Sequence, residues 1–426
     1  MAKNNADILP VETKKYQGWI VTFAGTGINL ALGVLYAWSI ISKQISKEWG
    51  WSETQTALPY SVAIALFAFT MVPAGRLQDK WGPRLVATLG GIFCGVGFIV
   101  ASLSQSLVGL IIGFGILAGM GIGFGYASAT PPAVKWFPPE RTGLIAGLVV
   151  AGFGLASVYI APLANYLLGN FGIQKSFLIL GIAFLLAVVA LAQILKNPPA
   201  YYKPASISQN PGPQKVPAKI TGKIIDYEWS EMLRTPQFYL LWIMYVFGAG
   251  AGLMIIGKLA KIVDLQAGIK AGFIFVAMLA VGNAAGRVIA GVLSDKIGRT
   301  WTMFFVFIFQ AVLMFILRWL GTYSALFIAS ILIGFNYGAN LSVFPSVTKD
   351  YFGLKNFGLN YGLIFTAWGV GGILGPILSG WIYDQAKNFN NAYLIASICL
   401  LMAAALTFIT RPPKTKIAAE ELAKAA

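Results

Sequence analysis

An arginine inside an apolar segment is the strongest candidate for chemistry in this sequence. Arg287 lies in "VGNAAGRVIAG", with Asn283 one helical turn earlier. A buried guanidinium is costly, and its planar fork of donors suits a carboxylate bound through both oxygens. No acidic residue is near in the sequence, so we expect Arg287 to bind an anion, with Asn283 holding the guanidinium or a ligand hydroxyl. The alternatives are that Arg287 extends to the membrane surface and that Asn283 makes an ordinary interhelical hydrogen bond.

Side chains among glycines and other small residues are candidates for the rest of a pocket. Small neighbours leave room for a ligand, as in "GIGFGYAS", "GFNYGAN" and "IFTAWGVGG". Each aromatic taken singly is better explained by helix packing or lipid contact. As a set around one arginine, they predict a binding site formed by Asn29, Leu35, Tyr36, Tyr126, Tyr337, Phe365 and Trp368.

The apolar character of the chain decides which elements must hold these side chains. The 426 residues are 57% hydrophobic and 11% charged, and the mean hydropathy is +0.73, whereas soluble domains carry roughly 25% charged residues. A lipid bilayer is therefore the expected surroundings. The net charge of +16 does not indicate nucleic acid, because the basic residues lie in short gaps between apolar runs.

Twelve apolar segments have the length of a membrane-spanning helix, about 17–25 residues. The polar N-terminus is followed by a segment without a signal-peptide cleavage pattern, so this segment is expected to stay and span. Ser52 and Gln55 predict a capping box before the second segment. The expected spans are 18–41, 57–74, 85–103, 107–134, 143–168, 176–195, 238–257, 271–293, 301–320, 324–348, 359–383 and 392–410.

A stretch rich in Pro, Ser and Lys divides these segments into two sets of six. Residues 196–237 include "KNPPAYYKPASISQNPGPQKVPAK", which is typical of a solvated linker. The following "YEWSEMLRTPQFY" predicts a short interfacial helix. We expect an all-α membrane protein with two pseudo-symmetric six-helix bundles, residues 1–195 and 238–426, the second ending in a tail.

The distribution of lysine and arginine predicts the orientation. Most of them lie in loops on the side of the N-terminus, which leaves Arg287 as the one expected inside a helix. The positive-inside rule then places both termini and the linker in the cytoplasm. We expect a multi-pass protein of the plasma (inner) membrane.

The two sets of six carry the same charged turn. "GRLQDKWGPR" begins at Gly75 between the second and third segments, and "GVLSDKIGRT" begins at Gly291 between the eighth and ninth. A second repeated sequence pairs "GLIAGLVVAGFG" from Gly143 with "GLNYGLIFTAWG" from Gly358. The repeat indicates two similar halves with a substrate site near the midplane between them.

The repeated turn resembles the signature of the major facilitator superfamily. That resemblance implies conformational gating, without substrate contact, by Asp79, Arg84, Asp295 and Arg299. In physical terms, Gly75 and Gly291 are expected to permit close packing. Asp79 and Asp295 are expected to accept backbone N–H bonds at a neighbouring helix N-terminus. The alternative is a charged loop that only follows the positive-inside rule.

Arg287, "WSEMLRTPQFYLLW" and "FTAWG" together resemble the monocarboxylate transporter and oxalate:formate antiporter branch, and most of all its bacterial lactate-type members. Two departures matter. Trp368 stands where the antiporter has a lysine, and one cation suits one carboxylate. Asn283 stands where animal carriers have an aspartate, and Ile40 lies near the position of their helix-one lysine, so no intramembrane proton-binding group is identified.

These features predict a secondary active transporter that moves a small monocarboxylate, such as lactate or pyruvate, by alternating access with a proton as coupling ion. An organic anion exchanger of the oxalate:formate type is the alternative. An embedded enzyme or scaffold has little support, because the apolar segments hold no cluster of catalytic groups and the chain has no histidine. We expect no cofactor, no metal, no nucleic acid and no obligate protein partner.

Overall fold

The regular structure of this chain is helical. The computed structural model describes residues 11–138, 141–199, 202, 226–353 and 356–413, and these residues contain helices and no strand. The first half contains α1 (Val11–Leu32), η1 (Gly33–Ala37), α2 (Trp38–Trp49), α3 (Glu53–Trp81), α4 (Pro83–Ser102), α5 (Leu107–Leu110), η2 (Ile111–Ala118), α6 (Gly119–Lys135) and α7 (Thr142–Ala192). The second half contains α8 (Trp229–Met232), α9 (Pro236–Ala267), α10 (Gly272–Ile297), α11 (Arg299–Leu317), α12 (Tyr323–Phe352), α13 (Phe357–Ala386) and α14 (Asn390–Ile409).

The long helix α7 crosses the molecule twice. Its 51 residues would extend about 76 Å if straight, more than twice the thickness of a bilayer core. Gly172 has φ 72° and ψ 175°, outside the helical region, and breaks the helix there. In the described residues, eleven helical segments are long and apolar enough to span a membrane, and α7 supplies two passes. The twelve expected spans are therefore accounted for.

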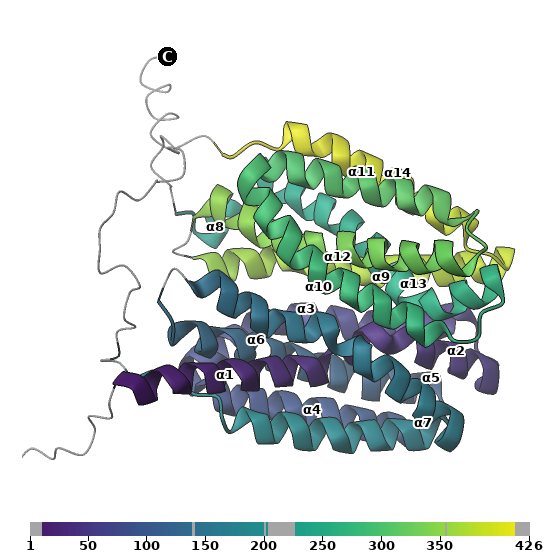
Figure 1. Ribbon diagram of the computed structural model, residues 1–426, viewed down its shortest axis with the longest axis horizontal. Coiled ribbons are helices and arrows are strands. Elements are labelled where there is room, and N and C mark those ends of the chain that lie inside the picture. Colours follow the sequence, from purple (N-terminus) through teal and green to yellow (C-terminus); the bar gives the residue numbers. More distant parts are fainter. Residues whose placement is uncertain (1–10, 139–140, 200–201, 203–225, 354–355, 414–426) are drawn as a thin grey trace, which may run out of the picture.

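The helices run side by side between two ends of the molecule (Figure 1). At one end α1 begins, α8 lies and α14 finishes, and we call this end the tail face. At the other end lie the turns before α3, after α9 and after α13, and we call it the far face. The two halves meet where α3 packs against α13 and α7 packs against α10.

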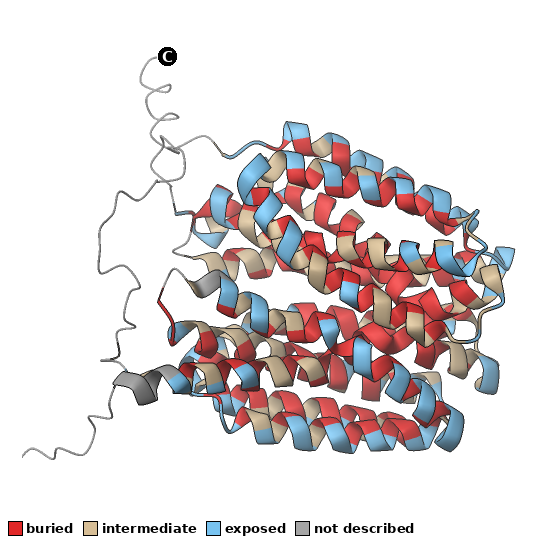
Figure 2. Cartoon of the chain, in the orientation of Figure 1, coloured by how far each residue is buried: buried red, intermediate tan, exposed pale blue. Residues whose placement is uncertain are grey.

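The outer surface of the helices is apolar, as a lipid-facing surface requires. Exposed positions follow the outward sides of the peripheral helices, while the inward sides are buried (Figure 2). Large exposed hydrophobic side chains include Leu186 of α7, Val288 of α10 and Ile409 of α14. Soluble proteins rarely expose apolar surface on this scale. The molecule is a multi-span membrane protein.

The capping box before α3 is confirmed. Gln55 donates its backbone N–H to Ser52 Oγ at 3.2 Å, and its side chain accepts the Ser52 N–H at 2.9 Å. The expected interfacial helix is also present as α8, with a capping box between Glu228 and Glu231. Most of the expected linker falls on residues 200–201 and 203–225, outside the described residues. The domain boundaries at 195 and 238 stay predictions.

The repeated turn is a one-residue break between helices. Gly82 joins α3 to α4 with φ 84° and ψ 161°, and Gly298 joins α10 to α11 with φ 89° and ψ 160°. Only glycine adopts this backbone conformation readily. Two breaks of nearly identical geometry in equivalent places support the expected internal repeat.

Part of the expected chemistry of this turn is wrong. A Cβ on Gly75 would meet nothing within 4 Å, so Gly75 serves no close packing here, whereas one on Gly291 would lie 2.9 Å from the Ser342 hydroxyl of α12, so Gly291 does permit a close approach. Asp295 accepts a side-chain bond from Arg299 at 2.7 Å, and Asp79 lies 4.0 Å from Lys135. The carboxylates therefore pair with side chains within their own halves instead of capping a neighbouring helix.

Candidate functional site

Arg287 lies between the two halves and is held by neutral groups. It is half-buried in α10, where Gly286 brings the helix so close to α12 that a Cβ would lie 1.9 Å from the Phe335 carbonyl oxygen. Its Nε donates to Asn283 Oδ1 at 3.1 Å, one turn earlier on the same helix. Its Nη1 donates to the Val150 carbonyl of α7 at 3.1 Å. The guanidinium thus bridges the halves and retains donors for a further partner.

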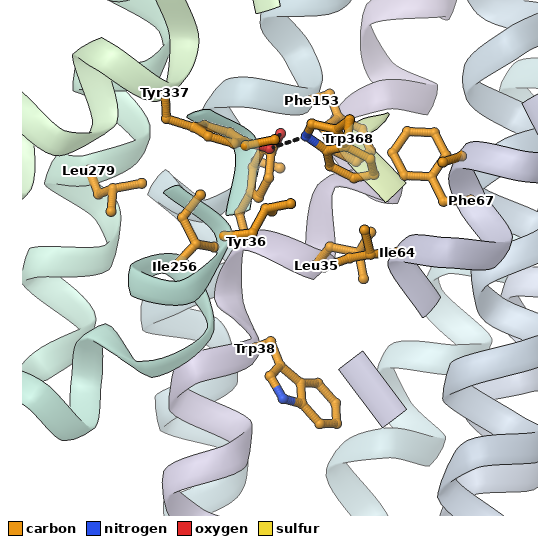
Figure 3. Packing of buried hydrophobic residues seen from close by; sticks show 14 of the residues in the cluster. Leu35, Tyr36, Trp38, Ile64, Phe67, Phe153, Ile256, Leu279, Tyr337 and Trp368 are labelled. Atoms are coloured by element: carbon orange, nitrogen blue, oxygen red, sulfur yellow. Dashed lines mark hydrogen bonds between the residues drawn. The ribbon is translucent and has the colours of Figure 1, made fainter. Parts of the chain in front are cut away.

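A chain of hydroxyl and indole groups continues from the guanidinium. Arg287 Nη2 makes a long contact of 3.5 Å with the Tyr36 hydroxyl of η1. Tyr36 shares a 3.1 Å hydrogen bond with the Tyr337 hydroxyl of α12, and Trp368 Nε1 of α13 donates to that same hydroxyl at 2.8 Å. Figure 3 shows the Tyr337 side chain reaching toward the Trp368 indole nitrogen, next to Tyr36. The structure thus brings together four of the predicted residues that lie far apart in the sequence.

Aromatic rings from both halves surround the site. Phe365 stacks on Trp368 with ring centres 5.1 Å apart. Tyr126 stands edge-on to Phe153 at 5.2 Å, and Phe153 in turn stands edge-on to Tyr36 at the same distance. The sequence reasoning missed Phe153 and also Phe67, which contacts the rings of Tyr126, Phe365 and Trp368. Their surrounding sequences are ordinary apolar helix, so only the fold identifies them.

Two predicted residues lie away from Arg287. Leu35 is buried beside Ile64, on the other side of η1 from the Tyr337 ring (Figure 3). Asn29 donates to the Val149 carbonyl at 2.8 Å and so joins α1 to α7 within the first half. Neighbouring residues of the tight η1 helix point to different sides, and for this reason Tyr36 reaches the site while Leu35 packs against α3.

The site carries one positive charge and no compensating carboxylate. Asn283 is fully buried, and its Nδ2 has no hydrogen-bond partner among the described residues. Within the same part of the chain, no Asp or Glu forms an ion pair with Arg287. The described residues also contain no group of three His, Cys, Asp or Glu side chains suited to a metal ion. The chemistry available here is anion binding by Arg287, with neutral hydrogen-bonding groups around it.

A second buried charge, which the sequence reasoning missed, lies nearer the far face. The span expected to end at residue 257 continues to Ala267, so Lys258 lies inside α9 and is 1% exposed. Its ammonium donates to Glu53 Oε2 at 2.6 Å, to the Glu53 carbonyl at 2.8 Å and to Thr56 Oγ1 at 2.8 Å. Arg287 is therefore not the only basic residue inside a helix. The expected span ended at residue 257 because the charged Lys258 interrupts the run of apolar residues.

The far face is further closed by Asp384 and Asp264 of the second half. Asp384 caps the start of α3, accepting from the backbone N–H groups of Glu53 at 2.8 Å and Thr54 at 2.9 Å. Asp264 pairs with Lys43 of α2 at 3.0 Å. We call the group Glu53, Thr54, Thr56, Lys258 and Asp384 the far-face clasp. It joins the halves above the Arg287 site, so the structure is closed on this face.

The residues predicted to gate the tail face make contacts within their own halves. Arg299 binds Asp350 of α12 at 2.6 Å through Nε and Asp295 at 2.7 Å through Nη1. Asp79 lies near Lys135 of α6. Arg84 is the second residue of α4, two positions after Gly82. A gating role for these residues stays a prediction.

Comparison with known proteins places the whole chain in one family. The model of the family described as Major Facilitator Superfamily matches residues 19–278 and 259–425. The solved inward-facing, occupied structure of a bacterial homolog to the human lysosomal transporter Spinster is similar in fold, with a TM-score of 0.67 at 17% identity. The match covers 93% of this chain and 96% of that one.

Three curated proteins are similar in sequence along most of their length. The chain is 31% identical to an uncharacterized MFS-type transporter, YhjX, of Escherichia coli, covering 83% of this chain and 86% of that protein. It is 31% identical to the oxalate:formate antiporter of Oxalobacter formigenes, covering 92% of each. It is 26% identical to monocarboxylate transporter 11 of Mus musculus, covering 90% and 85%.

Proposed function

The chain belongs to the major facilitator superfamily, and from this we propose that it moves a small monocarboxylate, such as lactate or pyruvate, by alternating access. Membership of a transporter family makes it a membrane transporter. Its relatives include an oxalate:formate antiporter and monocarboxylate transporters. The substrate, the coupling ion and the orientation are our proposals.

The observation that carries the proposal is the neutral surroundings of Arg287. Its described partners are an amide, a backbone carbonyl and a phenol. A cation held between the halves without a carboxylate is stabilised when an anionic ligand arrives. A carboxylate suits the guanidinium fork, and the unpartnered Asn283 Nδ2 offers one more donor. Tyr126, Tyr337, Phe365 and Trp368 are proposed to surround the rest of the substrate, with Tyr36.

Alternating access needs contacts that form on one face while the other opens. The far-face clasp and the pair Lys43–Asp264 hold the halves together in this conformation. We propose that Asp79, Arg84, Asp295 and Arg299 control the opposite, tail face. With the basic loops on that side, the tail face is the cytoplasmic one in an inner membrane, and the far face is external.

An exchanger of the oxalate:formate type is the second candidate, favoured by the 31% identity over 92% of both chains. The buried Trp368 argues against a dianion. Its indole donates to Tyr337 and stacks on Phe365, where a second cation would be needed to hold a second carboxylate. We therefore propose one carboxylate for each transport cycle.

We propose that a proton accompanies the substrate. Arg287 with a bound carboxylate is nearly neutral, and a proton moving with the substrate leaves no net charge to carry across the membrane. An imposed pH gradient should then drive uptake into proteoliposomes that contain no internal anion. A strict requirement for an internal anion would instead identify an exchanger.

The proposal is tested by thermal-shift titration of the detergent-purified protein with L-lactate, pyruvate, acetate and oxalate. Binding to the folded state raises the melting temperature as the ligand exceeds its Kd. We expect monocarboxylates to stabilise the wild-type protein, and Arg287→Ala to weaken this effect at least about tenfold, the loss of one charged hydrogen-bonded pair. Uptake of labelled L-lactate should fall in parallel.

Arg318→Ala provides the matched control, because Arg318 stacks on the Trp319 ring at 4.0 Å, in the turn after α11. This variant should bind and transport like the wild-type protein. Undiminished lactate binding in Arg287→Ala would refute the assigned role. Stabilisation by oxalate alone would favour the exchanger.

A further inference from the structure

We propose that a lysine-lined cavity on the far face is an outer binding site for small carboxylates, where the substrate is held before the far face opens. The cavity has a volume of about 730 Å³ and lies between the halves. The choice of a carboxylate rests on the proposed function, but the site itself rests on its own geometry. We call it the outer vestibule.

The outer vestibule is formed by helices of both halves. Ile40, Lys43, Gln44, Ser46 and Lys47 come from α2, and Asn165, Leu168 and Gly169 from the first arm of α7. The second half contributes Ala260, Lys261 and Asp264 of α9, with Lys270, Gly272 and Phe273 at the start of α10. A ligand here contacts both halves at once, so its binding depends on how the halves are placed.

The charges of the lining are unbalanced. Four lysines line the cavity, against one carboxylate, Asp264. Asp264 is already shared by Lys43 at 3.0 Å and Lys270 at 2.8 Å. Glu48, outside the lining, accepts a hydrogen bond from the neutral Gln44 and keeps its charge, so the four lysines still outnumber the two carboxylates Asp264 and Glu48.

The deeper carboxylate does not remove this surplus. Glu53 is held at 2.6 Å by the buried Lys258, and Lys261 reaches it only at 3.7 Å. A partly enclosed cavity with walls of one charge sign concentrates ions of the opposite sign, with gains in association rate of about 10 to 1,000-fold. The lining therefore favours small anions, and lysine ammonium groups bind carboxylates as point charges.

One chain segment links the outer vestibule to the Arg287 site. Ile40 lines the vestibule, and Tyr36, whose hydroxyl contacts Arg287, precedes Ile40 by four residues on this segment. A carboxylate in the vestibule competes with Asp264 for Lys43 and so loosens a pair that joins the halves. Binding in the vestibule thus favours opening toward the inner site.

The experiment measures the local potential with a thiol, independently of transport. Asn165→Cys in the lining is combined with Cys94→Ala and Cys399→Ala. Its reaction rates with an anionic (sulfonate) and a cationic (trimethylammonium) methanethiosulfonate are compared in proteoliposomes. Gln105→Cys, an exposed position before α5 on the same face, is the matched control. We expect the anionic-to-cationic rate ratio at Asn165→Cys to be at least about tenfold higher than at the control.

The double variant Lys47→Gln with Lys270→Gln tests whether the lysines cause this preference for the anionic reagent. It keeps Lys43 and Lys261, which make contacts between the halves. This double variant should lower the ratio severalfold, and so should about 1 M salt, which shortens the screening length to about 3 Å. Equal ratios at Asn165→Cys and Gln105→Cys would overturn the outer site. A preference found in zwitterionic lipid but abolished in anionic lipid would also overturn it, by showing that the lysines hold lipid headgroups.

A transport measurement on the same double variant assigns the ligand. The KM for lactate presented to the far face should rise about threefold or more, while the KM from the tail face stays unchanged. Unchanged KM values from both faces would overturn the substrate role of the vestibule. A charge preference in a protein that moves no monocarboxylate would contradict the proposed function while leaving an anion site standing.

Discussion

At the scale of single residues, the decisive feature is that Arg287 has partners which cannot neutralise it. Asn283 Oδ1 accepts from Nε at 3.1 Å, and the amide adds hydrogen bonding without charge. A carboxylate at the same position would satisfy the guanidinium internally. The single difference between an amide and an acid therefore decides whether the arginine is available to a substrate.

Asn283→Asp tests this reasoning. At neutral pH the new carboxylate pairs with Arg287, and the affinity for monocarboxylates should fall at least about tenfold. Protonation removes the charge of the introduced carboxyl and frees Arg287, so binding should recover as the pH falls. Thermal-shift titrations between neutral and acidic pH measure this. Asn283→Ala is the control, and the same pH response in both variants would contradict the explanation.

Trp368→Lys adds the second cation that the site lacks. The indole now donates to Tyr337, which is linked through Tyr36 to Arg287, so an ammonium there would stand close to a bound anion. We expect the ratio of oxalate to lactate affinity to rise about tenfold or more, measured by titration. Trp368→Met controls for the lost ring. An equal change in the neutral variant would assign the effect to space instead of charge.

At the scale of elements, the first turn of α3 is the contact on which the far face closes. Lys258 of α9 and Asp384 of α13 both bind it, one through side-chain and carbonyl oxygens and the other through backbone N–H groups. Buried ion pairs contribute little compared with apolar packing, but removing one partner leaves an uncompensated charge. A variant that breaks the far-face clasp therefore tests whether these contacts hold this face closed.

Lys258→Met should favour conformations that expose Glu53 to water. The buried carboxylate would keep only its 3.7 Å contact with Lys261, and this loss of its main partner disfavours the closed far face by up to about 3–5 kcal/mol, enough to reverse a two-state preference. Alkylation of Ser42→Cys, buried here beside the Gly257 carbonyl, should become at least about tenfold faster. Adding Glu53→Gln to Lys258→Met should restore slow labelling. Slow labelling in Lys258→Met alone would contradict the role of the clasp.

The close packing of α3 against α13 predicts that a larger side chain at this contact would impair transport. A Cβ at Gly369 would lie 2.7 Å from the Ala68 Cβ in the other half, whereas one at Gly147 would meet nothing within 4 Å. Gly369→Val should cost roughly 1–3 kcal/mol in this conformation by overpacking and lower the rate of lactate uptake about tenfold. Gly147→Val should leave uptake nearly unchanged. Equal effects would point to a general cost of valine in these helices.

At the scale of the whole molecule, transport requires that the far face open and close. The contact between Thr54 Oγ1 and Asp384 Oδ2 at 2.5 Å brings the two halves together at that face. Thr54→Cys with Asp384→Cys, without the native cysteines, should cross-link on oxidation. Lactate uptake should then stop and return on reduction, while the single-cysteine variants stay active under oxidant. Continued uptake by a fully cross-linked protein would contradict alternating access across this face.

The sequence was enough for the twelve spans, the internal repeat, the cap of α3 and the charge of Arg287, since each depends on local pattern. It could not pair Lys258 with Glu53, which lies 205 residues away. A hydropathy pattern also cannot distinguish a lysine that ends a helix from one buried against another half. The opposite placements of Leu35 and Tyr36 depend on the tight η1 helix, which the apolar run conceals.

The contact of Gly369 with Ala68 lies near the middle of α3, whose 29 residues extend about 43 Å. If α3 tilts while this contact stays in place, the helix rotates about its middle. Its two ends then move in opposite directions, so separating Thr54 from Asp384 at one end draws Trp81 toward the other half at the opposite end. It follows that a molecule wedged into the far face would hold the tail face shut, and the protein can be inhibited at one surface by a compound that never reaches the other.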